Sequence, residues 1–308
     1  MELVDARKWR KKDSNKIEVV DVQGIETYQL PWEPLKIMPI GDIQYDGAGG
    51  AADLKRLKRH LAWGIRNNVR FVGMGDMIDV LSPSNRQRMA AAGFYDTATT
   101  FFDKAVTSLE KELLKVLEPT KGMWLGLVQG HHYYPHLDGT TTDTRFADWL
   151  ECPYLGDCSI IRLHFKDERS RQGKVLKMWV HHGNGGSGVL PTAIYNKLYH
   201  QKVRYPQVRL FLMGHVPQLG NVTLEGLDSE GPAGDPHLTH EDTKLVACGG
   251  FSRGYQQGSN FAGRAQGGYA EKGMMPPAVL GGVVITITPE TAKFRGRSVR
   301  TLDLKVSS

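Results

Sequence analysis

The chain of 308 residues is 40% apolar and has a net charge of +6. This length suits one large α/β domain with a substantial core, and no apolar stretch approaches the roughly 20 residues of a membrane span. The N-terminal residues are charged and lack the apolar core of a signal peptide, and the three cysteines fit neither a disulfide framework nor a zinc motif. We therefore expect a cytoplasmic protein that does not enter a membrane.

The positive charge is concentrated at the two ends of the chain. Residues 1–16 hold six basic and three acidic side chains, and residues 292–308 hold five and one. These ends carry +3 and +4, so removing their +7 from the total of +6 leaves −1 for the body. Solvated charged arms explain this pattern, and arms that hold nucleic acid are the alternative.

Predicted strands and helices alternate in the N-terminal half of the chain. Weak alternation over residues 17–28 predicts an edge strand, and the apolar runs 35–40 and 69–74 predict buried strands. Between these two runs, Asp53 is expected to cap a helix that has leucines at helical spacing. Residues 80–97 break the periodicity directly after a predicted ligand, which is typical of a rim or flap over a site.

The following segment predicts a long helix that ends before Pro119. Its apolar stripe consists of Phe101, Ala105, Leu109, Leu113 and Leu117. The later elements expected are a strand at 123–128, a short helix at 141–150, paired strands at 159–165 and 175–180, a helix at 192–201, a strand at 208–213, an exposed excursion at 225–242, and strands at 244–247 and 283–288.

Five of the predicted strands share one pattern, in which an apolar run is followed by a turn and then by an acid or a histidine. The polar residues in these positions are Asp42, Asp76, His131 with His132, His181 with His182, and His215. In an α/β core, sites form at the carboxyl ends of the strands, so we expect these side chains to converge there. Carboxylates and imidazoles suit divalent transition metals such as Zn, Mn or Fe.

These motifs resemble those of the calcineurin-like metallophosphoesterase superfamily. The family signatures are Asp-x-His, Gly-Asp-x-x-Asp, Gly-Asn-His-Asp/Glu, a later His, and Gly-His-x-His, and their order is kept here across residues 37–218. Residues 250–255, 269–271 and 276–277 look like the C-terminal half of a bacterial and phage branch. The resemblance implies an α/β fold whose β-sandwich core is flanked by helices in α/β/β/α layers. It also implies a single domain over residues 17–308, with insertions near 80–97 and 225–242, behind a charged arm at 1–16.

The resemblance also implies a role for each polar residue of the pattern. Asp42 would bind a first metal ion and Asp76 would bridge two. The second ion would be completed by His131, His182 (or its neighbour His181) and His215. His132 occupies the position of the family's catalytic histidine, and Asp79 would orient a neighbouring group rather than bind metal.

Four positions depart from the family pattern: Gln44 and Pro217 replace histidines of the first metal site, His131 replaces an asparagine, and Tyr133 replaces an acid. The second site is thereby rich in nitrogen, while the first keeps Asp42, Asp76 and the amide oxygen of Gln44. We therefore expect two divalent ions, with Mn²⁺ first and Zn²⁺, Fe or Mg²⁺ as alternatives, and a second site that binds more tightly than the first.

The activity implied is hydrolysis of a phosphoester by a metal-activated hydroxide, with a leaning to phosphodiesterase or nuclease-like action on nucleotides or nucleic acid. A phosphomonoesterase acting on a small metabolite is one alternative. A non-catalytic binding or regulatory protein with a degraded first metal site is another. Arg145, Arg253 and, in the segment 80–97, Arg86 and Arg88 are candidate contacts for the substrate phosphate, with solvated arginines as the competing interpretation. The sequence names no protein partner.

Overall fold

The computed structural model describes residues 25–47, 50–167, 173–184, 192–215, 218–231, 234–255, 260–261, 264–265, 269–272, 274 and 277–308. The expected arm at 1–16 and Pro217 lie outside the described residues, as does most of the segment expected to form the first edge strand.

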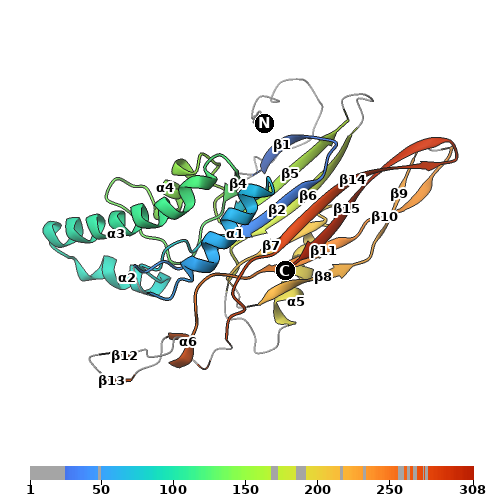
Figure 1. The fold of residues 1–308 in the computed structure, drawn as a ribbon. Helices are drawn as coiled ribbons and strands as arrows, with labels where there is room; N and C mark the ends of the chain where they lie inside the picture. Colours follow the sequence, from blue (N-terminus) through green and yellow to red (C-terminus); the bar gives the residue numbers. More distant parts are fainter. Residues whose placement is uncertain are drawn as a thin grey trace, which may run out of the picture.

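Two β-sheets stacked face to face form the centre of the fold (Figure 1). The six-stranded sheet contains, in spatial order, β1 (Ile25–Pro31), β5 (Cys158–Lys166), β6 (Gly173–His181), β7 (Leu210–Met213), β11 (Thr243–Cys248) and β8 (Leu219–Leu224). The five-stranded sheet contains β15 (Arg297–Ser307), β14 (Val284–Phe294), β2 (Leu35–Ile40), β3 (Arg70–Gly73) and β4 (Trp124–Leu127). Short two-stranded pairings join β9 (Leu227–Glu230) to β10 (His237–His240) and β12 (Asn260–Phe261) to β13 (Arg264–Ala265).

Alternation along the strands divides the apolar side chains between three core layers. In β2, Ile37 belongs to the cluster between the sheets, whereas Met38 belongs to the cluster under the helices. In β6, Val180 faces the partner sheet and Trp179 faces the opposite side. Because successive side chains of a strand point to opposite faces, a strand buried on both faces reads as a continuous apolar run, as these do.

Helices cover the outer faces of both sheets. Those on the five-stranded sheet are α1 (Leu54–Arg66), α3 (Asp96–Leu117) and α4 (Thr142–Trp149), with α2 (Pro83–Ala92) beside α3 and a 3₁₀ turn (Glu118–Thr120) after it. The other outer face is covered by α5 (Ala193–Arg204), whose Ile194 and Leu198 pack on the six-stranded sheet, and a short helix α6 (Tyr269–Lys272) lies further along the chain. The layers therefore run α/β/β/α, as expected. Asp53 caps α1 by accepting a hydrogen bond from the Arg56 N–H, also as expected.

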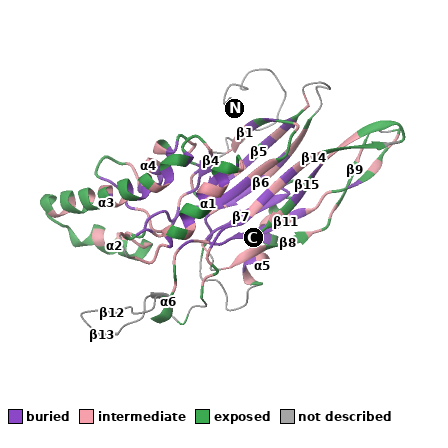
Figure 2. Ribbon diagram, viewed as in Figure 1, coloured by how far each residue is buried: buried purple, intermediate pink, exposed green. Residues whose placement is uncertain are grey.

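The apolar stripe predicted for the long helix is wrong over its first two turns. Phe101 is 69% exposed and Ala105 is exposed, while the buried positions of α3 are Val106, Glu110, Leu113 and Leu117. The first half of α3 extends beyond the sheets beside α2, so no core is available to cover it (Figures 1 and 2). Burial of an apolar stripe needs a partner surface as well as a periodic pattern.

Of the two C-terminal segments expected to be exposed, one is built into the five-stranded sheet and the other forms a separate, largely exposed two-stranded ribbon. Residues 297–307 form β15, which pairs with β14 along its whole length and buries Leu302 and Leu304 in the core. The expected excursion at 225–242 contains the β9–β10 ribbon, which is tied to the β14–β15 hairpin through ion pairs of Asp235 with Arg295 and Arg297. The basic C-terminal residues are therefore part of a strand and its turn rather than a free arm.

Candidate metal centre

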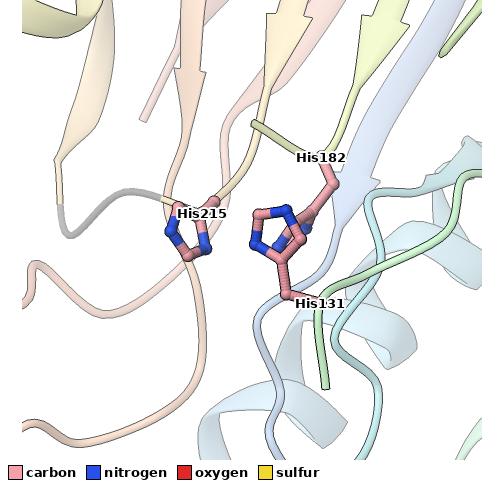
Figure 3. Close-up of side chains that lie close together, drawn as sticks. All are labelled: His131, His182 and His215. Atoms are coloured by element: carbon pink, nitrogen blue, oxygen red, sulfur yellow. The ribbon is translucent and has the colours of Figure 1, made fainter. Parts of the chain in front are cut away.

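The polar residues that follow the core strands meet at one edge of the sandwich (Figure 3). In the five-stranded sheet β2, β3 and β4 are parallel, and in the six-stranded sheet β6 and β7 are parallel. Their carboxyl ends therefore point the same way within each sheet. The turns after these strands bring Asp42, Asp76, His131, His182 and His215 together.

Three of these candidate ligands adopt a backbone conformation that L-residues rarely use. The φ angles are 47° at Asp42, 52° at Asp76 and 56° at His215, and Gln44 has a φ of 48°. Left-handed backbone at residues other than glycine costs roughly 1 kcal/mol or more per position, and it concentrates at functional sites. Hydrogen bonds between the turns compensate, since the Asp42 N–H donates to the Gly75 carbonyl at 3.0 Å.

Two glycines allow the turns to approach each other closely. A Cβ at Gly130 would lie 2.1 Å from the Asp76 backbone nitrogen, and a Cβ at Gly250 would lie 2.7 Å from the Asp42 Cβ. Neither position has room for a side chain. Gly130 was part of the pattern recognised in the sequence, whereas the contact of Gly250 with Asp42 spans the chain and could not be read from it.

The candidate ligand atoms form two overlapping sets. One consists of His131, His182 and His215, and the other of Asp42, Asp76, His182 and His215; within each set the ligand atoms lie within 4.8 Å of one another. The three imidazole rings have centroids 4.6 to 5.1 Å apart. His182 and His215 are common to both sets. The bridging of two ions by Asp76 stays a prediction.

Two buried atoms at the centre of this cluster lack a hydrogen-bond partner among the described residues: Asp76 Oδ2 and His182 Nε2. They lie 3.2 Å apart, an ion-pair distance without hydrogen-bond geometry. Their other atoms are fixed, because His182 Nδ1 donates to the Met74 carbonyl at 2.6 Å and Asp76 Oδ1 accepts the N–H groups of His131 (2.5 Å) and His132 (2.9 Å). A histidine held through one nitrogen, with the other nitrogen free, is the usual arrangement of a metal ligand. The donor set thus fits a divalent transition metal.

At His131, His215 and Asp76 the electrostatic environment favours the protonation state that a metal ligand needs. Burial, with His182 nearby, lowers the pKa of His131, and burial with His182 and His131 lowers that of His215 to about 4, so both rings are neutral at pH 7. Burial favours protonated Asp76, but His182 and the His132 N–H outweigh it and hold its pKa below the usual range.

The remaining two groups carry the charge conflict of a buried, acid-rich site. Burial, reinforced by Asp76, raises the pKa of Asp42 to about 7. Burial opposes protonation of His182, yet Asp76 and Asp42 raise its pKa to about 9. Coordination at His182 Nε2 would release this proton and relieve the conflict between the two carboxylates.

His132 lies beside the cluster but belongs to neither ligand set. Its Nδ1 is 2.6 Å from Asp79 Oδ1, and its N–H donates to Asp76. The Asp79 contact fixes the ring and leaves Nε2 for a proton transfer. Asp79 is therefore placed to orient His132.

His181 is separated from the cluster. Its ring stacks on Trp179, with centroids 5.5 Å apart and planes 13° apart, and its Nδ1 accepts the Gly183 N–H at 2.7 Å. Of the two adjacent histidines, His182 is therefore the one that faces the candidate ligands.

The loop that carries His131 and His132 is held by Asp143, which the sequence did not point to, and by Arg86, which was expected to contact phosphate. Fully buried Asp143 accepts the Gly130 N–H at 2.8 Å. Arg86 of α2 donates to the carbonyls of His131 (2.6 Å) and Tyr133 (3.2 Å), and its guanidinium lies 3.8 Å from the centre of the Tyr133 ring. The segment 80–97, expected to form a rim, therefore reaches this loop through Arg86.

Gln44 lies next to the centre through its backbone, whose N–H donates to the Asp76 carbonyl at 2.9 Å. Its side chain is half-buried. Its role as an oxygen ligand of a first metal ion stays a prediction.

The two arginines expected to contact substrate phosphate are engaged elsewhere. Arg145 pairs with Asp138 (2.8 Å) and with buried Glu110 (3.3 Å), which also pairs with His136 (2.9 Å). Arg253 pairs with Asp53 at 3.2 Å, beside the start of α1. Both guanidinium groups thus form ion pairs within the fold, and their contact with a substrate phosphate stays a prediction.

No protein-family model matches this chain, and a comparison with curated proteins finds no match either. Among solved structures, vacuolar protein sorting 29 from Cryptosporidium parvum is similar at 12% sequence identity and a TM-score of 0.36, over 89% of this chain and 100% of that one. At this level the similarity supports no assignment of fold or function. In the part of the chain that the structure describes, no helix is long and apolar enough to cross a membrane.

Proposed function

We propose that this chain is a metal-dependent phosphoesterase. The observation that carries the proposal is the convergence of five candidate ligands at one sheet edge, where Asp76 Oδ2 and His182 Nε2 face each other at 3.2 Å and have no hydrogen-bond partner among the described residues. Burying two carboxylates and three imidazoles together costs folding free energy unless a ligand completes the site. A metal-ion site offsets that cost.

The residues of the site have separable roles in this proposal. Asp42, Asp76, His131, His182 and His215 hold one or two divalent ions. When bound, such ions supply a hydroxide nucleophile at neutral pH and neutralise charge on the phosphoryl group. His132, oriented by Asp79, gives its Nε2 proton to the leaving oxygen or stabilises the charge that develops there.

Within this class we propose a phosphodiester substrate, of the nucleotide or nucleic-acid kind, and Mn²⁺ as the first choice of metal. Support comes from the row of basic side chains on α1, which is Lys55, Arg56, Lys58 and Arg59. A phosphomonoester is the alternative. We also propose two unequal metal sites, because Gln44 offers an amide oxygen where the family resembled has an imidazole.

A second candidate function is a binding or regulatory protein that holds metal without turnover. The same Gln44 favours it, since it weakens one of the two sites. The candidates differ in one measurable property, because both bind metal and only the enzyme hydrolyses a phosphoester.

Metal analysis of the purified protein, combined with hydrolysis of bis-p-nitrophenyl phosphate with and without Mn²⁺, tests the proposal. We expect metal-dependent turnover that Asp76→Asn and His132→Ala reduce by at least about 100-fold. His240→Ala, at an exposed histidine of β10, is the matched control and should keep wild-type activity. A comparison with p-nitrophenyl phosphate separates diester from monoester preference.

If the protein binds metal but hydrolyses no phosphoester with any added ion, it is a binding or regulatory protein and not an enzyme of this class. Absence of metal binding would contradict both candidates. Two equally tight Mn²⁺ sites in a titration would refute the interpretation of Gln44.

A further inference from the structure

A cleft of about 590 Å³ lies on the outer side of the six-stranded sheet, between α5 and the ends of β6 and β7. Its lining includes His181, Gly183, Lys197, His200, Arg204 and Tyr205. None of these residues belongs to the candidate ligand sets.

The cleft is adjacent to the metal centre. Gly183, which lines it, directly follows His182, and a Cβ at Gly183 would lie 3.0 Å from the His215 Cβ. The backbone at Gly183 thus lies on the boundary between the cleft and the centre. His181 faces the cleft while its neighbour His182 faces the metal ligands.

The charge of the lining is positive. Lys197 and Arg204 supply this charge, and with His200 they lie on one face of α5 at intervals of three and four residues, beside the apolar residues that pack on the sheet. Lys197 Nζ donates to the Asn184 carbonyl at the rim (2.8 Å). No acidic side chain occurs among the described residues of the lining. Asp157, whose charge reaches His181, lies outside it.

The floor of the cleft adds hydrogen-bond donors. Trp179 is only 4% exposed, and within the described part of the chain its Nε1 has no nitrogen or oxygen acceptor. This N–H interacts instead with the thiol of Cys158, which is a weak acceptor and also lines the cleft. His181 accepts the Gly183 N–H through Nδ1, so its Nε2 carries the proton in the neutral ring. Because the Trp179 Nε1 is enclosed and bonded to that thiol, the donor that the floor offers to a ligand is the Nε2–H of His181.

We propose that this cleft is a binding site for the phosphate group of an organic phosphate, separate from the candidate metal centre. Phosphate oxygens are acceptors for Arg204, Lys197 and the Nε2–H of His181, and they carry the negative charge that the lining lacks. The half-exposed ring of Tyr205, 38% accessible at the rim, offers a flat surface to the organic part of the ligand.

Calorimetric titration of the full chain with 5′-AMP, in EDTA so that the metal centre is inactive, tests the proposal. Wild-type protein should bind AMP and should not bind adenosine, which has no phosphate. Arg204→Gln should weaken binding about tenfold, as expected for the loss of one charge-assisted hydrogen bond. Arg66→Gln, which removes an exposed charge at the end of α1, should bind AMP within about twofold of wild type, because a distant surface charge is screened.

Equal affinity of Arg204→Gln and wild type for AMP would overturn the proposal, and so would tight binding of adenosine or the absence of AMP binding at millimolar concentration. Thermal unfolding of each variant shows whether it is folded. The outcome is independent of the proposed phosphoesterase activity. Hydrolysis of bis-p-nitrophenyl phosphate with Mn²⁺ fails or succeeds separately from AMP binding in EDTA.

Discussion

Replacing Asp42 by Asn separates the metal-binding role of this residue from its effect on folding. The amide has the shape of the carboxylate, and its oxygen can still accept the His215 N–H, which Asp42 Oδ2 accepts at 2.8 Å. Asn also tolerates the left-handed backbone at this position, where φ is 47°. The substitution therefore removes a charge and little else.

The expected gain in stability follows from the pKa of the carboxyl group. Burial and Asp76 raise the pKa of Asp42 from 3.8 to about 7. The folded state therefore binds this proton more tightly than the unfolded state, and stability falls as the pH rises through the interval between these two values. Above pH 7 the penalty is at most about 4 kcal/mol. Asp42 is half-buried, and the carboxylate accepts a stronger bond from His215, so we expect a net gain of about 1–2 kcal/mol for Asp42→Asn.

Urea unfolding in EDTA at pH 8 and pH 5 measures this effect. The variant should be the more stable protein at pH 8, and its advantage should shrink by more than half at pH 5, where folded wild type keeps the proton. With Mn²⁺ present, wild type should become the more stable protein. At a free ion concentration 100 times the dissociation constant, the free energy of unfolding of wild type rises by about 2.7 kcal/mol, and that of the variant, which lacks one ligand, rises less.

The exposed Asp148 of α4 provides the matched control, and Asp148→Asn should leave the free energy of unfolding within about 0.5 kcal/mol of wild type. A variant at position 42 that is less stable than wild type in EDTA at pH 8 would refute the assignment of a buried, energetically costly carboxylate. Equal stabilisation of both proteins by Mn²⁺ would remove Asp42 from the metal ligands.

Three further predictions concern residues around the centre. Asp79→Asn should lower kcat for bis-p-nitrophenyl phosphate about 10- to 100-fold by releasing the His132 ring, with bound metal unchanged by elemental analysis; an unchanged kcat would contradict the orienting role. Glu110→Ala removes the buried carboxylate that Arg145 and His136 share and leaves each of them with one acidic partner, Asp138 and Asp103. The free energy of urea unfolding should fall by about 1.5–3 kcal/mol, and a loss below about 0.5 kcal/mol would show that the ion network is not structural. Gly250→Ala introduces a Cβ 2.7 Å from that of Asp42, so the affinity for Mn²⁺ in a titration should fall about tenfold. An affinity equal to that of wild type would mean that the turns carrying Gly250 and Asp42 can separate freely.

The strands and the candidate ligands could be predicted because both depend on local pattern. The run at 35–40 is β2 at the same residues, and Asp42 follows it at the expected sheet edge. A strand buried on both faces must be apolar throughout, and the turn that ends it must be short and polar. These requirements act on neighbouring residues, so a single sequence displays them.

The supporting contacts could not be predicted, since they join residues far apart in the chain. Arg86 holds the carbonyl of His131, 45 positions away, and Arg209 donates to the carbonyl of Leu302, 93 positions away. Nothing near an arginine in the sequence distinguishes one that holds a loop from one that binds a substrate. Arg145 illustrates the consequence, because its ion pairs lie within the fold.

The sequence by itself determined the α/β class, the order of the core strands and the set of acids and histidines at their ends, because strand burial and turn chemistry are properties of short segments. Only the tertiary structure decided which of these side chains meet. In the folded protein His182 rather than His181 lies at the centre, and His182 and His215 belong to both candidate ligand sets. The basic C-terminal segment forms β15. The physical reason is that ligand geometry depends on how two sheets stack, and stacking is set by the summed packing of side chains along the whole chain.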